Sequence, residues 1–277
     1  MSTRSALKGA LLIVACLSFA RPVSAVDPYE AVQDFAASGD DDNASNVTLT
    51  TGLPQTHDLD QAGGGEDQDW MLVPTIARHS YEARIAASSI GWDAGACPSC
   101  AQIERVSSSG AVLTEAVAIV NDGAGSTSES YDKSVRWIAS SSTIDEFLRV
   151  SGGAFFTENA SSVYTVRFWD TTYAIPRWNN ASGQVTVLLI SSLIQAPASV
   201  RIDFYSALGT LLGSQSFTLN ANQLIVFNTG TLPALAGQSG HAYVVHTAGY
   251  GGLAGKAVAL EAATGFSFDT PMVPIPN

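Results

Sequence analysis

The sequence is poor in the residue types from which metal and catalytic centres are built. It has three cysteines and four histidines in 277 residues, and charged residues make up only 14% of the chain. The four histidines, His57, His79, His241 and His246, are scattered, and no two have the spacing of a zinc site. This composition does not indicate a metalloenzyme.

Basic residues and long apolar runs are also scarce. The chain has 13 Lys and Arg against 25 Asp and Glu, a formal net charge of −12, which repels phosphate backbones and anionic membranes. We therefore expect no nucleic-acid partner. Beyond the first 25 residues no stretch is apolar enough to cross a bilayer, so no transmembrane segment is predicted. Hydrophobic residues nevertheless reach 46%, which is enough for a sizeable core.

Residues 1–25 have the three parts of a signal peptide. Arg4 and Lys8 are its positive start, Gly9–Ala20 its apolar run, and Val23-Ser24-Ala25 its small-residue cleavage site. A mature chain from about Val26 would be secreted to the cell surface or extracellular space. Cleavage also removes Arg21, so three positive charges are lost and the net charge falls from −12 to −15.

The cysteines fit this exported setting. Cleavage would remove Cys16 and leave Cys97 and Cys100 as a lone pair, which we expect to form a disulfide in an oxidising compartment. An alternative for Cys16 is a lipoprotein anchor, because Ile13-Val14-Ala15 is a small-residue approach to a cysteine.

The rest of the chain has the period of β-strands. After an acidic, flexible lead-in at residues 26–46, short apolar runs alternate with Gly, Ser and Asn clusters. Tyr81, Ala83 and Ile85 share one face of such a run, and Val47–Leu53 begins another. We predict an all-β protein of two tandem antiparallel β-sandwiches, of jelly-roll or immunoglobulin-like kind.

The domain boundary is placed where the strand pattern breaks. Thr171–Ser182 contains a proline and an Asn-Asn-Ala-Ser-Gly turn, so the first sandwich is predicted at residues 47–173 and the second at 174–277. In the second, Val200, Ile202 and Phe204 alternate with polar residues, which is typical of a half-buried strand.

Residues 44–170 resemble the bacterial pre-peptidase C-terminal (PPC) domain, a β-sandwich appended to many secreted hydrolases. The resemblance depends on an acidic run leading to Asp69-Trp70, on Ser80-Tyr81 opening a strand, and on two later strands, Asp145–Gly152 and Tyr164–Arg167. Met71 stands where an aromatic is usual, and a CPSC insertion displaces the middle strand.

The second half resembles C-terminal sandwich modules of secreted bacterial proteins that end in "GKAVALEPATGFSFDTP". Gly255–Pro271 matches that ending, with Ala262 in place of the proline. This resemblance implies an extracellular bacterial setting and no particular activity.

One acidic loop could hold calcium. It has five carboxylates within twelve residues, next to three consecutive glycines, and calcium takes six to eight oxygen ligands from flexible loops. The spacing fits no EF-hand, so a solvated acidic turn is the alternative. The five residues are Asp58, Asp60, Glu66, Asp67 and Asp69.

No complete catalytic group is visible. Ser239 in Gly237–His241 is the only serine in a glycine frame with a nearby histidine, and it lacks the final glycine of GxSxG. We therefore expect no enzyme but an accessory or adhesion protein whose partner is an envelope polysaccharide or a surface protein. A calcium-dependent carbohydrate-binding protein and a secreted hydrolase with an atypical site are the alternatives. Aromatic residues for a sugar platform would be Trp169, Tyr173, Trp178, Tyr205 and Tyr250, but most aromatic residues in sandwiches fill the core, and we expect at most two of the five to face solvent.

Overall fold

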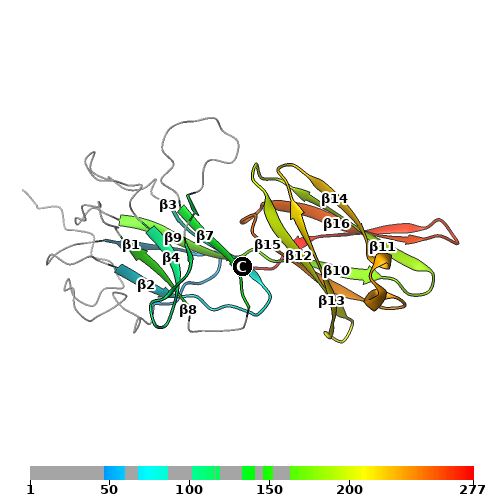
Figure 1. Cartoon of the computed structure of the whole chain (residues 1–277), viewed down its shortest axis with the longest axis horizontal. Coiled ribbons are helices and arrows are strands. Elements are labelled where there is room, and N and C mark those ends of the chain that lie inside the picture. Colours follow the sequence, from blue (N-terminus) through cyan, green and yellow to red (C-terminus); the bar gives the residue numbers. More distant parts are fainter. Residues whose placement is uncertain are drawn as a thin grey trace, which may run out of the picture.

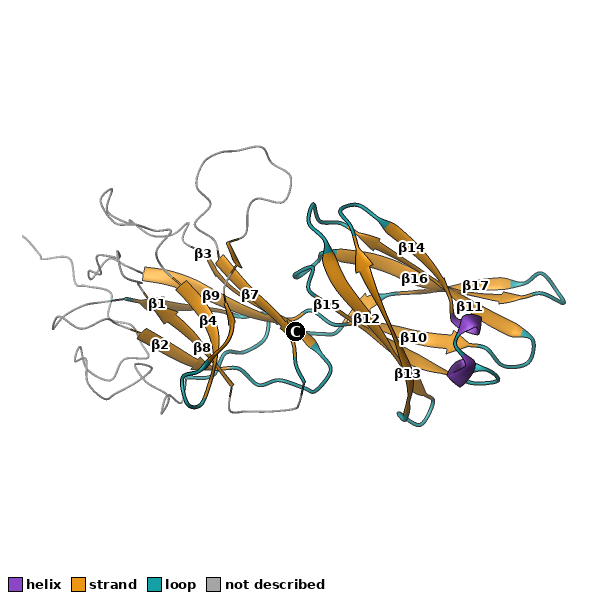
Figure 2. Cartoon of the chain, viewed as in Figure 1, coloured by secondary structure: helices purple, strands orange, loops and turns teal. Residues whose placement is uncertain are grey.

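The computed structural model describes residues 47–59, 68–86, 102–115, 117–118, 133–140, 146–151 and 163–277. In these residues the protein is all-β and forms two antiparallel β-sandwiches arranged end to end, with the C-terminus at their junction (Figure 1). The only helical turns described are two short 3-10 turns in the second sandwich, η3 (Thr229–Thr231) and η4 (Pro233–Leu235) (Figure 2). The predicted fold class is confirmed.

The first sandwich consists of a four-stranded and a five-stranded sheet. The four-stranded sheet has the order β2 (Gln68–Leu72), β8 (Glu146–Ser151), β4 (Gln102–Ser107) and β5 (Val112–Glu115). The five-stranded sheet has the order β1 (Pro54–Asp58), β9 (Val163–Asp170), β3 (Ser80–Ala86), β7 (Lys133–Ile138) and β6 (Val117–Ala118).

Alternating apolar residues of both sheets build the core of this sandwich. Tyr81 and Trp137 both stack on Phe168, with ring centroids 5.3 and 6.0 Å away, and their own rings are tilted to each other at 5.5 Å. Trp70 is buried in a separate small cluster with Val106 and Phe147, and its ring meets that of Phe147 edge-on at 5.8 Å. Each of these pairs lies within one sheet, and stacked and edge-on aromatic pairs contribute beyond their buried area, so they stabilise the association of its strands.

The second sandwich contains the strands that follow Asp170. One sheet has the order β13 (Leu211–Leu219), β12 (Ala198–Ser206), β15 (Ser239–His246), β10 (Tyr173–Asn179) and β18 (Val273–Pro274). The other has the order β14 (Leu224–Asn228), β11 (Gln184–Ser192), β16 (Leu253–Glu261) and β17 (Ser267–Pro271).

The predicted alternation along β12 sets the two faces of its sheet. Val200, Ile202 and Phe204 are buried in the core, and Arg201 and Tyr205 lie on the other face. The β12–β13 hairpin closes through a turn whose Gly209 has φ +81°, in the left-handed region that glycine adopts without strain.

Two sequence-based expectations about strands were wrong. The stretch expected to begin a strand at Val47–Leu53 has only an isolated bridge from Thr48 to Leu72, and the strand itself starts at Pro54. The pattern break at Thr171–Ser182 conceals strand β10, in which the register shifts between Ile175 and Trp178. This bulge around Pro176 puts Ile175 and Trp178 both in the core, although they are three residues apart, so simple alternation fails there.

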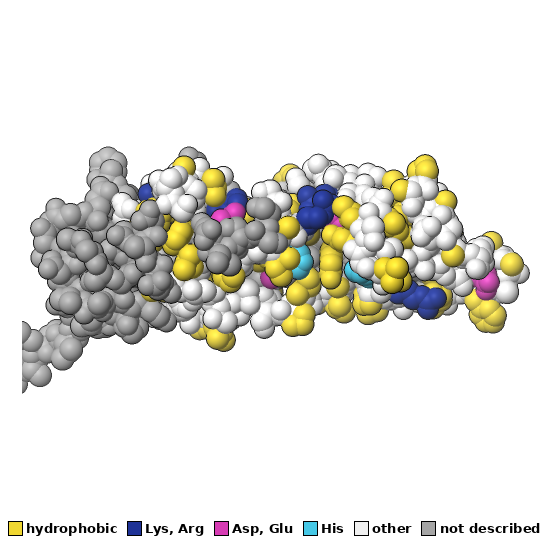
Figure 3. All heavy atoms as spheres, turned by 90° about the horizontal axis from the view of Figure 1, so that it is seen from below, with side chains coloured by type: hydrophobic (Ala, Val, Ile, Leu, Met, Phe, Trp, Pro, Cys, Tyr) yellow, Lys and Arg dark blue, Asp and Glu magenta, His cyan; other side chains and the backbone are white. Residues whose placement is uncertain are grey.

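The outer face of the β14–β11–β16–β17 sheet is also apolar. Leu189 pairs with Val226, Val187 with Val258, and Val185 with Leu260 along its register. Figure 3 shows hydrophobic side chains spread over the second sandwich among few charged ones. None of the described residues forms a helix that is long and apolar enough to cross a membrane.

Candidate functional site at the junction of the sandwiches

The chain crosses between the sandwiches through two residues, Thr171 and Thr172. The Thr171 backbone N–H donates to the carbonyl of Ser80 (2.8 Å), and the Thr171 hydroxyl donates to the Ser80 hydroxyl (3.0 Å). The Ser80 N–H in turn donates to the Thr172 hydroxyl at 2.9 Å. The Asn277 side-chain oxygen accepts from the Asp170 N–H at 2.8 Å. The crossing is therefore tied to β3 and to the last residue of the chain.

A buried carboxylate joins the two sandwiches. Asp203 of β12 has a fully buried side chain and receives Arg78 of the first sandwich in a bidentate pair, with N–O distances of 2.5 and 3.0 Å. Arg201 Nε (3.1 Å) and the Ser214 hydroxyl (2.7 Å) donate to the same carboxylate. Burial alone would raise the pKa of Asp203, but these donors outweigh it and hold the pKa below its usual value. Asp203 therefore stays ionised.

Arg78 has an unusual backbone for this role. Its φ is +68°, a backbone conformation that a residue with a side chain rarely adopts. The Arg78 N–H donates to the carbonyl of Ala139 at 2.8 Å, and this hydrogen bond stabilises the conformation. Its hydrogen bond to Asp203 raises the pKa of the Arg78 guanidinium, so the pair is ionic on both sides. Among the described residues, Arg78 and Asp203 form the only guanidinium–carboxylate pair that crosses the junction.

A second polar contact lies at the β3 side of the junction. Glu82 accepts from Arg136 Nε at 3.0 Å and from the backbone N–H of Tyr250 at 2.6 Å. Gly249, with φ +82°, lies against the guanidinium, and a Cβ there would lie 2.7 Å from Arg136 Cζ. The Tyr250 ring stacks on Trp169 with centroids 5.3 Å apart. The connection after β15 therefore fits closely onto the first sandwich.

His246 forms a third link. Its Nδ1 accepts from the Ala248 N–H at 3.1 Å, so the ring proton lies on Nε2, which donates to the carbonyl of Thr171 at 2.8 Å. Burial lowers the pKa of His246 to about 4. The ring is therefore neutral around pH 7 and serves as a structural link.

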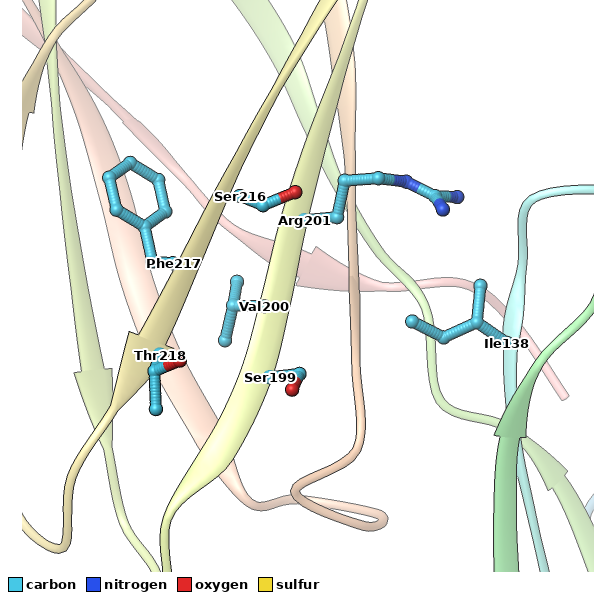
Figure 4. A pocket seen from close by; sticks show the side chains of 7 residues that line it. All are labelled: Ile138, Ser199, Val200, Arg201, Ser216, Phe217 and Thr218. Atoms are coloured by element: carbon cyan, nitrogen blue, oxygen red, sulfur yellow. The ribbon is translucent and has the colours of Figure 1, made fainter. Parts of the chain in front are cut away.

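An open groove of about 420 Å³ lies at this junction, between Ile138 of the first sandwich and strands β12 and β13 of the second (Figure 4). The Arg201 side chain extends toward the side of Ile138 (Figure 4). Its Nη2 atom is buried and has no hydrogen-bond partner in the part of the chain that the structure describes. The lining residues are Ile138, Ser199, Val200, Arg201, Ser216, Phe217 and Thr218.

The described residues give no nucleophile–base pair. His79 Nδ1 lies 2.6 Å from Asp170 Oδ2, which is the base-and-orienter half of a triad, but the nearby Ser80 and Thr171 hydroxyls bond each other. His241 stacks on Tyr205 at 5.3 Å, and no hydrogen bond joins it to Ser239 in the described structure. His241 and His246 lie on opposite faces of β15, because they are an odd number of residues apart in the strand.

The predicted calcium residues are only partly described. Asp69 is buried in β2 and accepts a hydrogen bond from the Tyr164 hydroxyl, so its carboxylate contributes to the first core. Asp58 is the last residue of β1, and Asp60, Glu66 and Asp67 lie outside the described residues. Among the described residues no group of three potential ligands gathers. The calcium site stays a prediction.

The cysteines also lie outside the described residues. Cys16, Cys97 and Cys100 are among the residues for which the structure gives no description, so the Cys97–Cys100 disulfide and the alternative lipid anchor stay predictions.

The proposed aromatic platform is not formed. Tyr173 and Trp178 are core residues, Trp169 and Tyr205 are half-buried in stacks, and Tyr250 is the exposed member of the set. Arg78, Arg201 and Asp203 were not singled out from the sequence. The sequence signal for them is that Arg201 and Asp203 are the two charged residues on the outward face of a half-buried strand, in a chain with only 13 basic residues.

Comparisons with known proteins give little further information. No family model matches the chain, and no curated protein matches its sequence. Among solved structures, the chain is similar to a calcium-binding mutant of Bacteroides uniformis β-glucuronidase 2, with 11% identity and a TM-score of 0.20. The match covers 80% of this chain and 33% of that one, and so low a score carries no argument about fold or function. The PPC resemblance of residues 44–170 stays a prediction.

Proposed function

We propose that this chain is an exported, non-enzymatic binding protein that acts as an accessory or adhesion module at the cell surface or in the extracellular space. The signal-like segment at residues 1–25 supports export, and the resemblance to a module appended to secreted hydrolases supports an accessory role. The proposed partner is an envelope polysaccharide or a surface protein.

The observation that carries the proposal is the groove at the junction. Ligand sites commonly lie between domains, and a volume of about 420 Å³ is within the range of small-ligand pockets. In the described residues its lining contains hydroxyls, a guanidinium and apolar groups but no histidine, aspartate or glutamate. Such a lining can bind and orient a ligand, but it has no group that would exchange a proton with it near pH 7.

The junction also keeps the groove in shape. The walls of the groove belong to different sandwiches, which Asp203, Glu82 and His246 hold together. A preformed site loses little conformational entropy when a ligand binds, which favours affinity.

A capture experiment tests this proposal. Mature protein from Val26 is immobilised and exposed to the host's envelope and polysaccharide fractions, with and without calcium. Ser216→Trp fills the groove, and Ser267→Trp, on an exposed position of β17, is the matched control. We expect wild type and Ser267→Trp to retain the same component and Ser216→Trp to lose it. Equal capture by all three proteins, or by none, would refute the groove as the binding site.

A further inference from the structure

From the chemistry of the groove we infer that its ligand is an acidic saccharide, with a carboxylate on the Arg201 guanidinium and sugar hydroxyls on Ser199, Ser216 and Thr218. This inference rests on the proposed binding function and names the class of ligand.

The first argument concerns the hydrogen-bond donors of the Arg201 guanidinium that Asp203 does not use. Only its Nε donates to Asp203, and the buried Nη2 has no acceptor in the described structure. A buried donor without an acceptor is costly, and a guanidinium binds a carboxylate through two parallel hydrogen bonds. If the guanidinium turns outward into the groove, a ligand carboxylate gives Nη2 the acceptor that it lacks among the described residues.

The second argument is the local charge. Arg78 and Arg201 share the single carboxylate of Asp203, so this cluster carries one excess positive charge in a chain whose formal net charge is −12. A densely charged polyanion such as nucleic acid would be repelled by the rest of the surface. One carboxylate on an otherwise uncharged sugar matches one excess positive charge.

The third argument is the arrangement of hydroxyls. Arg201 pairs with Ser216 and Ser199 with Thr218 across the β12–β13 register, so all four side chains lie on one face of the hairpin. Their neighbouring hydroxyls can donate to and accept from sugar hydroxyls. Ile138 on the opposite wall offers an apolar surface to the C–H groups of a sugar ring.

Titration calorimetry of the mature protein tests the inference with galacturonic acid, which carries one carboxylate, with its methyl ester, and with sodium sulfate as probes. We expect the acid to bind, with an affinity that falls as salt rises, and the uncharged ester to bind about tenfold more weakly or not at all. Binding of sulfate alone, at the same strength as the saccharide, would mean a simple anion site and would overturn the saccharide assignment.

Two variants locate the binding. Arg201→Gln should weaken binding of the acid at least about tenfold, while Asp203 keeps Arg78 and Ser214 as partners and the fold is retained. Ser216→Glu places a carboxylate directly across from Arg201 in the β12–β13 register, and it should weaken binding of the acid similarly, by occupying the guanidinium and by repulsion. Arg177→Gln is the control, because Arg177 lies over the Phe268 ring, outside the groove lining. Wild-type affinity in Arg201→Gln and Ser216→Glu would overturn the inference.

The outcomes separate this inference from the proposed function. If Ser216→Trp abolishes capture of an envelope component but Arg201→Gln does not, the groove binds a ligand that is not acidic, and only the inference fails. If no variant affects capture and no saccharide binds, both fail.

Discussion

At the scale of single residues, His246 couples the stability of the protein to pH. Its pKa is near 6.5 in an unfolded chain and is lowered by burial to about 4 in the folded protein, so the unfolded state binds more protons between these values. The stabilisation is complete above about pH 6.5 and is lost as the pH falls toward 4. The total loss is on the order of 3 kcal/mol.

Substitution of His246 by Gln checks this coupling. Gln cannot titrate and can still donate to the carbonyl of Thr171, so the free energy of unfolding should depend less on pH between 7 and 4.5 than in the wild type. Urea denaturation at a series of pH values measures it. A variant with the wild-type slope would show that another group causes the acid sensitivity.

Asp203 should be far more important for stability than an exposed carboxylate. Asp203→Asn leaves Arg78 and Arg201 without their shared counter-charge, at an expected cost of about 2–4 kcal/mol. Asp269→Asn is the matched control. The side chains of its ion pair are 46% exposed at Lys256 and 52% exposed at Asp269, so the pair should contribute less than about 1 kcal/mol to stability. Chemical denaturation near pH 7 compares them, and equal losses would contradict the structural role of Asp203.

At the scale of secondary-structure elements, Gly240 determines how closely β12 and β15 approach. A Cβ at Gly240 would lie 1.9 Å from the carbonyl oxygen of Tyr205, whereas a Cβ at Gly213 in β13 would have an ordinary contact of 3.8 Å. Gly240→Ala must displace backbone and should cost about 2 kcal/mol or more, while Gly213→Ala should be near neutral. Thermal denaturation of both variants tests this, and similar melting temperatures would contradict it.

Most strands could be predicted from the sequence. One face of each strand is buried and the other is not, so apolar and polar residues alternate along it. β12 is the clearest case, since its buried residues alternate with outward polar ones. β10 was missed because a bulge at Pro176 resets the alternation. The site could not be predicted in the same way, because Arg78 and Asp203 are 125 residues apart and their contact depends on how two sandwiches meet.

The acidic loop between Asp58 and Asp69 offers a further test of the sequence prediction. If calcium binds the native state alone, it must raise stability, by about 2.7 kcal/mol at a hundredfold excess over Kd. Melting temperatures are compared after chelation and in millimolar calcium, with Asp67→Asn as the variant. No shift would mean a solvated acidic loop, and a shift abolished by Asp67→Asn would support a site. Asp69 is a poor choice of variant because it is buried against Tyr164.

At the scale of the whole molecule, the junction should make the two sandwiches unfold together. Interfaces between domains usually permit relative motion unless they are extensive. Here three different contacts cross the junction: an ion pair at Asp203, a carboxylate–backbone bond at Glu82 and a histidine–carbonyl bond at His246. Each contact involves at least one buried partner. When the sandwiches separate, these polar groups lose their hydrogen bonds to each other, and water replaces those bonds only in part.

Differential scanning calorimetry of the mature protein should therefore give one transition at pH 7, with equal calorimetric and van't Hoff enthalpies. Glu82→Ala removes the acceptor of both Arg136 and the Tyr250 N–H, and Asp203→Asn removes the shared carboxylate. The double variant should split the transition in two, because each sandwich has its own core but the coupling between them is weakened. Two transitions in the wild type would mean that the sandwiches are independent, and the groove between their walls would then not be a preformed site.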